Sequence, residues 1–150
     1  MSHTLIWVDH EAPELLFIWD WCRLERVEIK LCSTIREAHD ALAGYPKAKV
    51  PNTCLLLDAH VIKGWNQPHN EEEASMQNGV GPRVSGHLTL ANRDTRALWS
   101  PQTIVLSLFP KAMLTGKGFD ANWVYHRKED MPEKAKRHLF FEDIKAKVRL

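Results

Sequence analysis

Three short apolar runs in this chain end at a polar residue, and this pattern constrains the fold more than any other feature. Residues 53–57 (TCLLL) lead directly into Asp58, residues 4–8 (TLIWV) into Asp9, and residues 103–106 (TIVL) into Ser107. A short, continuous apolar run is typical of a strand in a parallel sheet that is covered on both faces. The runs therefore predict a buried parallel sheet with polar side chains at the carboxyl ends of its strands.

Helical patterns separate these runs and complete the predicted architecture. Two further strands are expected at residues 27–32, where apolar and polar residues alternate as at a sheet edge, and at residues 123–126. Helices are predicted at residues 13–24, 34–44, 85–99, 111–114 and 132–148, and a loop at residues 47–52. Five alternations of strand and helix predict an α/β fold, a five-stranded parallel sheet with helices on both faces, in a single domain over residues 1–150.

Residues 61–83 interrupt this alternation as a long insertion after the third strand. The segment has no sustained apolar period and contains several Gly and Pro residues as well as the acidic run 71–73. It is predicted to be a long loop or a partly disordered insertion. The acidic run is interpreted first as a solvated stretch and otherwise as a lid or a mimic of negative charge.

The charge balance and the apolar pattern restrict the classes of partner. The chain has 20 Lys and Arg against 19 Asp and Glu, a formal net charge of +1. A near-neutral chain has no bulk attraction for polyanions, so no direct nucleic-acid partner is expected. No stretch is long and apolar enough for a membrane span, and the three cysteines lie in apolar runs, so we expect a cytoplasmic protein with buried free thiols and no membrane partner.

The polar residues at the strand ends form the candidate functional site. Ligands of open parallel sheets bind outside the carboxyl ends of the strands. There the sequence places Asp9, His10, Glu11, Asp58, Ser107 and Lys128. Carboxylates can hold a hard cation such as Mg²⁺, while a hydroxyl and an ammonium can bind a phosphoryl group. The set therefore predicts a site for a divalent cation and a phosphoryl group.

Four segments that carry these residues resemble the receiver (CheY-like) domain of two-component response regulators. They are LIWVDHEAPELL, LLLDAHV, TIVLSL and VYHRKEDMPEKAKRHL, and together they extend over essentially the whole chain. The resemblance implies a flavodoxin-like, doubly wound sheet. It also implies a stand-alone response regulator with no output domain.

The same resemblance assigns roles to the strand-end residues. Asp58 would be the phosphoacceptor, Ser107 the switch hydroxyl and Lys128 the lysine that pairs with the phosphoryl group. Mg²⁺ would be the cofactor, held by Asp9, Glu11 and Asp58. The phosphoryl group would come from a sensor histidine kinase or phosphotransfer protein, and the signal would pass to a downstream protein partner. Self-phosphorylation and dephosphorylation of the acceptor would be the only chemistry, so no separate enzyme activity is expected.

The last strand and helix carry the expected interaction surface. Leu139 to Phe141 give the last helix an apolar and aromatic stretch, beside a basic face that is otherwise interpreted as solvated. Receivers commonly use this side for partners, so a homodimer through strand five and the last helix is a further candidate.

Two residues depart from the family pattern. His10 stands where the family has the second acidic metal ligand, and imidazole is a poor ligand for Mg²⁺. Metal binding then requires Glu11 in its place or a softer cation. Glu129 replaces the proline that commonly follows the family's lysine, and it could pair with Lys128.

Two other functions remain open on the sequence. A degenerate pseudo-receiver would act as a phosphorylation-independent adaptor. A small metal-dependent enzyme would use the same cluster, for example through His10, Asp58 and His60 as ligands of Zn²⁺ or Fe²⁺, although their spacing matches no known motif.

Overall fold

A five-stranded parallel sheet lies at the centre of the protein. The computed structural model describes residues 2–61 and 84–150. The strands are β1 His3–Val8, β2 Val27–Cys32, β3 Thr53–Leu57, β4 Thr103–Ser107 and β5 Val124–Arg127. Their spatial order is β2-β1-β3-β4-β5, and every pair is parallel. This order confirms the predicted flavodoxin-like, doubly wound sheet.

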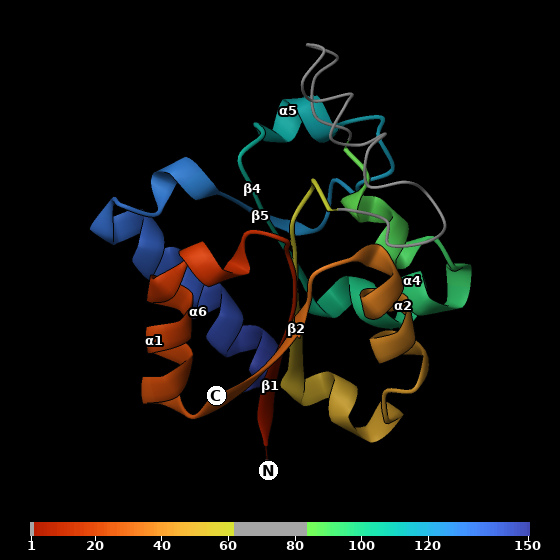
Figure 1. The fold of residues 1–150 in the computed structure, drawn as a ribbon, viewed down its shortest axis with the longest axis horizontal. Coiled ribbons are helices and arrows are strands. Elements are labelled where there is room, and N and C mark those ends of the chain that lie inside the picture. Colours follow the sequence, from red (N-terminus) through yellow and green to blue (C-terminus); the bar gives the residue numbers. More distant parts are fainter. Residues whose placement is uncertain (1, 62–83) are drawn as a thin grey trace.

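Helices cover both faces of the sheet (Figure 1). Helices α1 Leu16–Glu25 and α6 Lys134–Val148 lie on one face, and α2 Ile35–Ala43 and α4 Arg93–Trp99 lie on the other. The short helix α5 Lys111–Leu114 follows β4 beyond the carboxyl end of the sheet. Alternate residues of each central strand point to opposite faces, and each face has its own core.

The central strands are apolar throughout because both of their faces are covered. In β3, Leu55 and Leu57 join the core under α2 and α4, whereas Cys54 and Leu56 join the core under α1 and α6. In the edge strand β2, the exposed residues Glu28 and Lys30 alternate with buried or half-buried apolar residues, as predicted. All three cysteines are free and buried, and burial raises the pKa of Cys22 to about 12 and that of Cys32 to about 11.

Several boundaries differ from the sequence expectation. The predicted loop 47–52 is a 3-10 helix, Lys47–Asn52. The single helix predicted at 85–99 is divided into a 3-10 helix, Gly86–Leu90, and α4, because the Asn92 side chain accepts hydrogen bonds from Asp94 N and Thr95 N and caps a new helix. Within the predicted insertion only Val61 is described, and residues 71–73 lie outside the described residues.

Helix α6 presents less apolar surface than its sequence suggests. Leu139 is 59% exposed, but Phe140 is completely buried against the sheet. Phe141 stacks on Trp21 of α1, with ring centroids 4.6 Å apart. The aromatic pair thus joins α6 to α1 and leaves Leu139 as the outward apolar residue of this stretch. In the part of the chain that the structure describes, no helix combines the length and apolar character required to cross a bilayer.

Candidate functional site

The parallel register brings Asp9 and Asp58 side by side at the carboxyl end of the sheet. Val8 is the register partner of Leu57, and each aspartate follows its strand directly. The Asp58 amide donates to Val8 O at 2.9 Å, and the Asp9 amide donates to Cys32 O at 3.0 Å. Ladder hydrogen bonds therefore continue one residue beyond the strands, and they fix both aspartates at the same edge.

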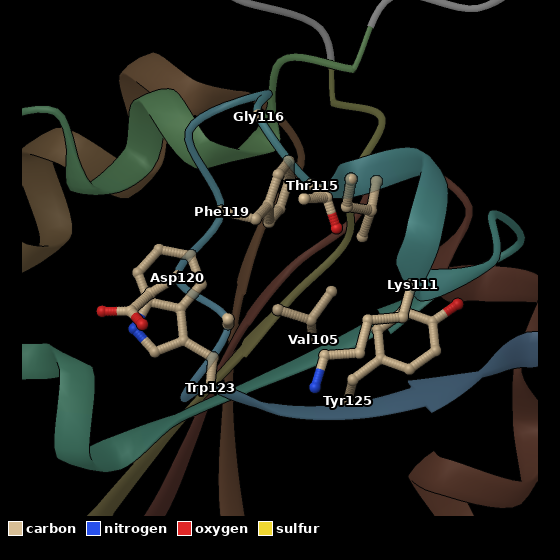
Figure 2. A pocket seen from close by; sticks show the side chains of 10 residues that line it. Val105, Lys111, Thr115, Gly116, Phe119, Asp120, Trp123 and Tyr125 are labelled. Atoms are coloured by element: carbon tan, nitrogen blue, oxygen red, sulfur yellow. The ribbon is translucent and has the colours of Figure 1, made fainter.

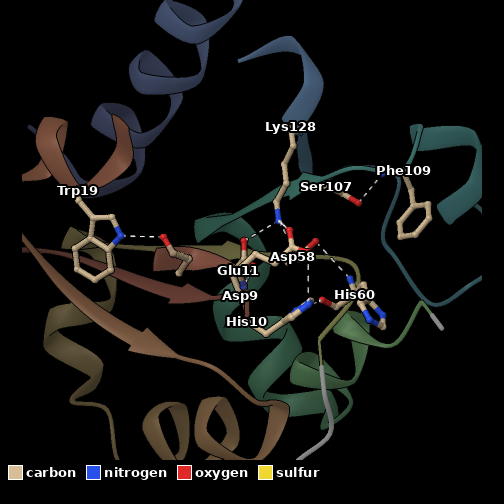
Figure 3. Close-up of polar contacts among 10 residues, drawn as sticks. Asp9, His10, Glu11, Trp19, Asp58, His60, Ser107, Phe109 and Lys128 are labelled. Carbon is tan, nitrogen blue, oxygen red and sulfur yellow. Dashed lines mark hydrogen bonds and ion pairs between the residues drawn. The ribbon is translucent and has the colours of Figure 1, made fainter. Parts of the chain in front are cut away.

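Lys128 reaches both aspartates from the opposite side of the site (Figure 3). Its Nζ lies 3.0 Å from Asp9 Oδ2 and 3.2 Å from Asp58 Oδ2. The three side chains are almost completely buried, with 5%, 1% and 4% of their surfaces exposed for Lys128, Asp9 and Asp58. Buried charges of this kind require paired partners. The residues predicted from the ends of strands one, three and five thus form one ion-paired cluster.

Burial and charge shift the ionisation of this cluster. Burial, reinforced by the neighbouring carboxylate of Asp9, raises the pKa of Asp58 to about 7, and Lys128 only partly opposes the shift. Burial alone would lower the pKa of Lys128, but the carboxylates of Asp58 and Asp9 outweigh it and raise that pKa. Lys128 is therefore charged at neutral pH, while Asp58 is poised between its acid and its carboxylate.

Glu11 and His10 form the more exposed side of the site. The Glu11 amide donates to Asp9 Oδ1 at 2.8 Å, a local turn that directs the Glu11 carboxylate to within 3.6 Å of Lys128 Nζ. His10 Nδ1 hydrogen-bonds to the backbone carbonyl of His60 at 3.1 Å, and its Nε2 lies 3.7 Å from Glu11 Oε1. One donor atom from each of Asp9, His10 and Asp58 lies within 4.8 Å of the others.

This donor set only partly suits the predicted Mg²⁺. Two buried carboxylates and an imidazole could hold a metal ion. However, Mg²⁺ prefers oxygen ligands in an octahedral arrangement, and His10 supplies a nitrogen. The predicted ligand Glu11 is not part of the close donor group but remains near it through Lys128. The donor set could therefore hold a metal ion, but it is not the all-oxygen set that Mg²⁺ prefers.

Ser107 lies at the end of β4 and is completely buried. Its Oγ accepts a hydrogen bond from Phe109 N at 3.0 Å, and Figure 3 shows it beside the turn that follows β4. This hydrogen bond uses a lone pair of the oxygen and leaves the O–H group as a donor. The role of Ser107 as the switch hydroxyl remains a prediction. The predicted pairing of Glu129 with Lys128 is wrong, because Glu129 pairs with Arg127 at 2.6 Å.

Comparison with solved structures shows that this chain has a known fold. The receiver domain of the Francisella response regulator 1452 matches with a TM-score of 0.60 at 12% identity, over 99% of this chain and 98% of that chain. A two-component response regulator from Clostridium difficile matches with a TM-score of 0.58 at 13% identity, over 99% and 97%. A putative response regulator from Chloroflexus aurantiacus matches with a TM-score of 0.55 at 16% identity, over the whole of both chains.

The protein has the fold of a response regulator receiver domain. The structural matches extend over nearly the full length of both partners, and the strand order is the one expected for that fold. No protein-family model and no curated protein sequence matches the chain. The predicted fold class is thus confirmed, whereas the chemistry of the site depends on the residues described above.

Gly86 lies directly against the backbone of Asp58, at the carboxyl end of β3. A Cβ at position 86 would lie 1.9 Å from the backbone oxygen of Asp58. Gly86 N and Ser85 N both donate to Ala59 O, at 2.8 and 3.0 Å, so the chain after the insertion returns directly onto the Asp58 loop. The absence of a side chain permits this close approach. Gly86 is also the first residue of the 3-10 helix Gly86–Leu90.

Tyr125 lies near the candidate site, and the sequence analysis did not single it out. Its hydroxyl donates to the carbonyl of Phe109, which ties β5 to the turn that also contacts Ser107. Tyr125 also lines a partly open pocket of about 70 Å³ with Val105 and Trp123 (Figure 2). None of the strand-end carboxylates lines this pocket. Its position three residues before Lys128, on the strand that leads into Lys128, was the available sequence signal.

Proposed function

We propose that the protein is a receiver that accepts a phosphoryl group on Asp58 and signals through protein–protein contacts. The donor would be a phosphohistidine on a sensor histidine kinase or a phosphotransfer protein. The observation that carries this proposal is the convergence of Asp9, Asp58 and Lys128 from the ends of three different strands, with both carboxylates within 3.2 Å of the ammonium. Ligands of open parallel sheets bind outside the carboxyl ends of the strands, and these three side chains lie at those ends.

The site residues support a simple transfer step. A carboxylate oxygen of Asp58 attacks phosphorus, the phosphorus–nitrogen bond to the donor histidine breaks, and the imidazole leaves and takes up a proton. Lys128 neutralises charge on the transferring group, and the Ser107 hydroxyl donates to a phosphoryl oxygen after transfer. Only the ionised carboxylate is a nucleophile. Because the pKa of Asp58 is raised to about 7, the transfer rate should increase as the pH rises towards and past neutrality.

The surface formed by β5 and α6 is the proposed output side. Tyr125 connects this strand to the turn after Ser107, and His126 Nε2 contacts Asp143 Oδ2 of α6 at 2.6 Å. A change at Lys128 or Ser107 would thus reach β5 and α6 through a short series of contacts. We propose this side as the contact for a downstream protein or for a second copy of the chain. A single domain over residues 1–150 and a cytoplasmic location belong to the same proposal.

Acetyl phosphate provides a direct test without a partner kinase. The protein is incubated with acetyl phosphate and, in separate reactions, with each of several divalent cations, and intact mass is measured. We expect one added phosphoryl group, lost in Asp58→Asn. Asp20→Asn is the matched control because Asp20 is an exposed carboxylate on α1, 67% exposed. An adduct that persists in Asp58→Asn, or no adduct with any cation, would contradict the proposal.

The absence of any adduct would favour the second candidate, a phosphorylation-independent adaptor. The specific observation behind it is His10, which replaces an acidic ligand, together with the ion pairs of Lys128 to both aspartates. In an adaptor, Asp58→Asn would leave partner binding unchanged, whereas in a phosphorylated receiver it would remove the response to phosphoryl donors.

A further inference from the structure

We propose that the site at Asp9, His10 and Asp58 binds a first-row transition cation such as Zn²⁺ or Co²⁺ in preference to Mg²⁺, with His10 as a ligand. The inference rests on the proposed function for the role that it gives the cation, which is to neutralise charge beside the phosphoacceptor. The binding itself is argued from the donor atoms alone.

The donor atoms are close enough to share one cation. One atom each from Asp9, His10 and Asp58 lies within 4.8 Å of the other two. Nitrogen and oxygen ligands bind Zn²⁺ at about 2.0–2.2 Å, so two donors of one ion are at most about 4.4 Å apart. By this estimate, side-chain shifts of well under about 1 Å would bring the three donor atoms within range of one ion. Two of the donors are fixed at the ends of β1 and β3, while the His10 side chain is 25% exposed and has room to move.

The hydrogen bond of His10 prepares one ring nitrogen to coordinate. The partner of Nδ1 is a backbone carbonyl, that of His60 at 3.1 Å, and a carbonyl only accepts hydrogen bonds. Nδ1 must therefore carry a proton. In the neutral ring, Nε2 then presents a lone pair, and it lies on the side of Glu11, whose Oε1 is 3.7 Å away and cannot donate when ionised. Metal-binding histidines usually hold their other nitrogen in this way, by donation to a carbonyl or carboxylate.

The charge of the cluster also favours an additional cation. Three carboxylates, those of Asp9, Glu11 and Asp58, face the single ammonium of Lys128. Oδ2 of Asp9 is buried and accepts no hydrogen bond, so the ammonium 3.0 Å away is its neutralising partner. This leaves an excess of two negative charges when all three acids are ionised. A divalent ion would remove the excess.

Lys128 leaves coordination capacity on both aspartates. It contacts Oδ2 of Asp9 and Oδ2 of Asp58. Oδ1 of Asp9 accepts one hydrogen bond from Glu11 N, and Oδ1 of Asp58 accepts a long one, 3.4 Å, from His60 N. Each carboxylate oxygen has two lone pairs, so each side chain can bind a cation and keep these partners.

The identity of the ligands sets the preference among cations. Mg²⁺ takes oxygen ligands and releases water reluctantly, so an imidazole adds little to its binding. Zn²⁺ and Co²⁺ accept imidazole nitrogen and carboxylate oxygen together, and sites with three protein ligands keep a further position open.

Cobalt absorption provides the test. The full chain is titrated with Co²⁺, and the visible d–d bands are followed. We expect bands that saturate at one equivalent, disappear when one equivalent of Zn²⁺ is added, and persist in a large excess of Mg²⁺. His10→Asp should weaken Co²⁺ binding by at least about tenfold. His138→Asp is the matched control, because His138 is an exposed histidine on α6, and it should bind Co²⁺ like the unmodified protein.

Three results would overturn the inference. These are no saturable bands, bands that His10→Asp leaves unchanged, and displacement of Co²⁺ by an equal concentration of Mg²⁺. The reaction with acetyl phosphate separates this failure from that of the proposed function. An Asp58 adduct formed with Mg²⁺ in a protein without Co²⁺ bands would leave phosphotransfer standing and overturn the cation preference. Bands that require His10, without an adduct in any cation, would support the cation site and contradict phosphotransfer.

Discussion

At the scale of single residues, Lys128 is the positive charge on which the buried carboxylates depend. Its Nζ contacts Asp9 and Asp58 at 3.0 and 3.2 Å, and all three side chains are at most 5% exposed. Removal of one partner from a buried ion pair leaves an uncompensated charge. The stability of the protein and the ionisation of Asp58, the proposed phosphoacceptor, therefore depend on the same side chain.

Lys128→Met should destabilise the protein strongly. The methyl-terminated chain fills the space but leaves two buried carboxylates without an ammonium, which costs about 3–5 kcal/mol in comparable cases. The loss should be smaller at acidic pH, where the carboxylates take up protons. Urea unfolding of the variant and the native protein at several pH values measures this loss of stability. Lys136→Met, which removes a solvent-exposed ion pair with Asp130, should leave the midpoint unchanged, and equal effects of the two substitutions would contradict this account.

Asp58→Asn should have the opposite effect on stability. The raised pKa of Asp58, about 7 against an ordinary value of 3.8, means that the folded state holds a proton that the unfolded state has released between these pH values. The contribution of Asp58 to the free energy of unfolding therefore falls as the pH rises through this window. The neutral amide has no such dependence, so the variant should gain on the order of 4 kcal/mol relative to the native protein between about pH 4 and pH 8. If the difference in free energy of unfolding between the variant and the native protein stays constant with pH, the raised pKa of Asp58 is contradicted.

At the scale of elements, the sequence predicted the strands better than the segments that join them. β1, β3 and β4 were predicted because two covered faces require continuous apolar runs, and that requirement is visible in the sequence. The division of residues 85–99 into a 3-10 helix and α4 was not predicted. It depends on the approach of Gly86 to the Asp58 loop and on the Asn92 cap, and tertiary contacts of this kind leave little periodicity.

Gly86→Ala tests that approach. A methyl group would meet the backbone oxygen of Asp58 at 1.9 Å, so either the acceptor loop or the 3-10 helix must move. We expect a destabilisation of about 1–3 kcal/mol, as for other overpacked sites, together with slower phosphorylation of Asp58. Gly44→Ala is the matched control, because nothing lies within 4 Å of its Cβ position. Equal unfolding midpoints for the two variants would argue against a role for the close contact.

At the scale of the whole molecule, the order of the strands explains how residues distant in sequence form one site. Parallel strands bring Asp9, Asp58 and Lys128 to one edge, and this juxtaposition was predicted from the motifs. What the sequence could not provide was the detail of the contacts: the His10 bond to the His60 carbonyl, the Arg127 partner of Glu129 and the inward packing of Phe140. These depend on side-chain directions that periodicity does not determine.

The central claim is that Asp58 is the phosphoacceptor, and peptide mapping tests it most directly. The protein is treated with acetyl phosphate and a divalent cation, and borohydride then reduces any acyl phosphate to an alcohol before digestion and mass spectrometry. The account predicts that the modified side chain is Asp58 and that Asp9 and Glu11 are unmodified, because Asp58 is the carboxylate that the proposed transfer uses beside Lys128. Modification at another carboxylate, or none under conditions that phosphorylate a known receiver, would contradict the account.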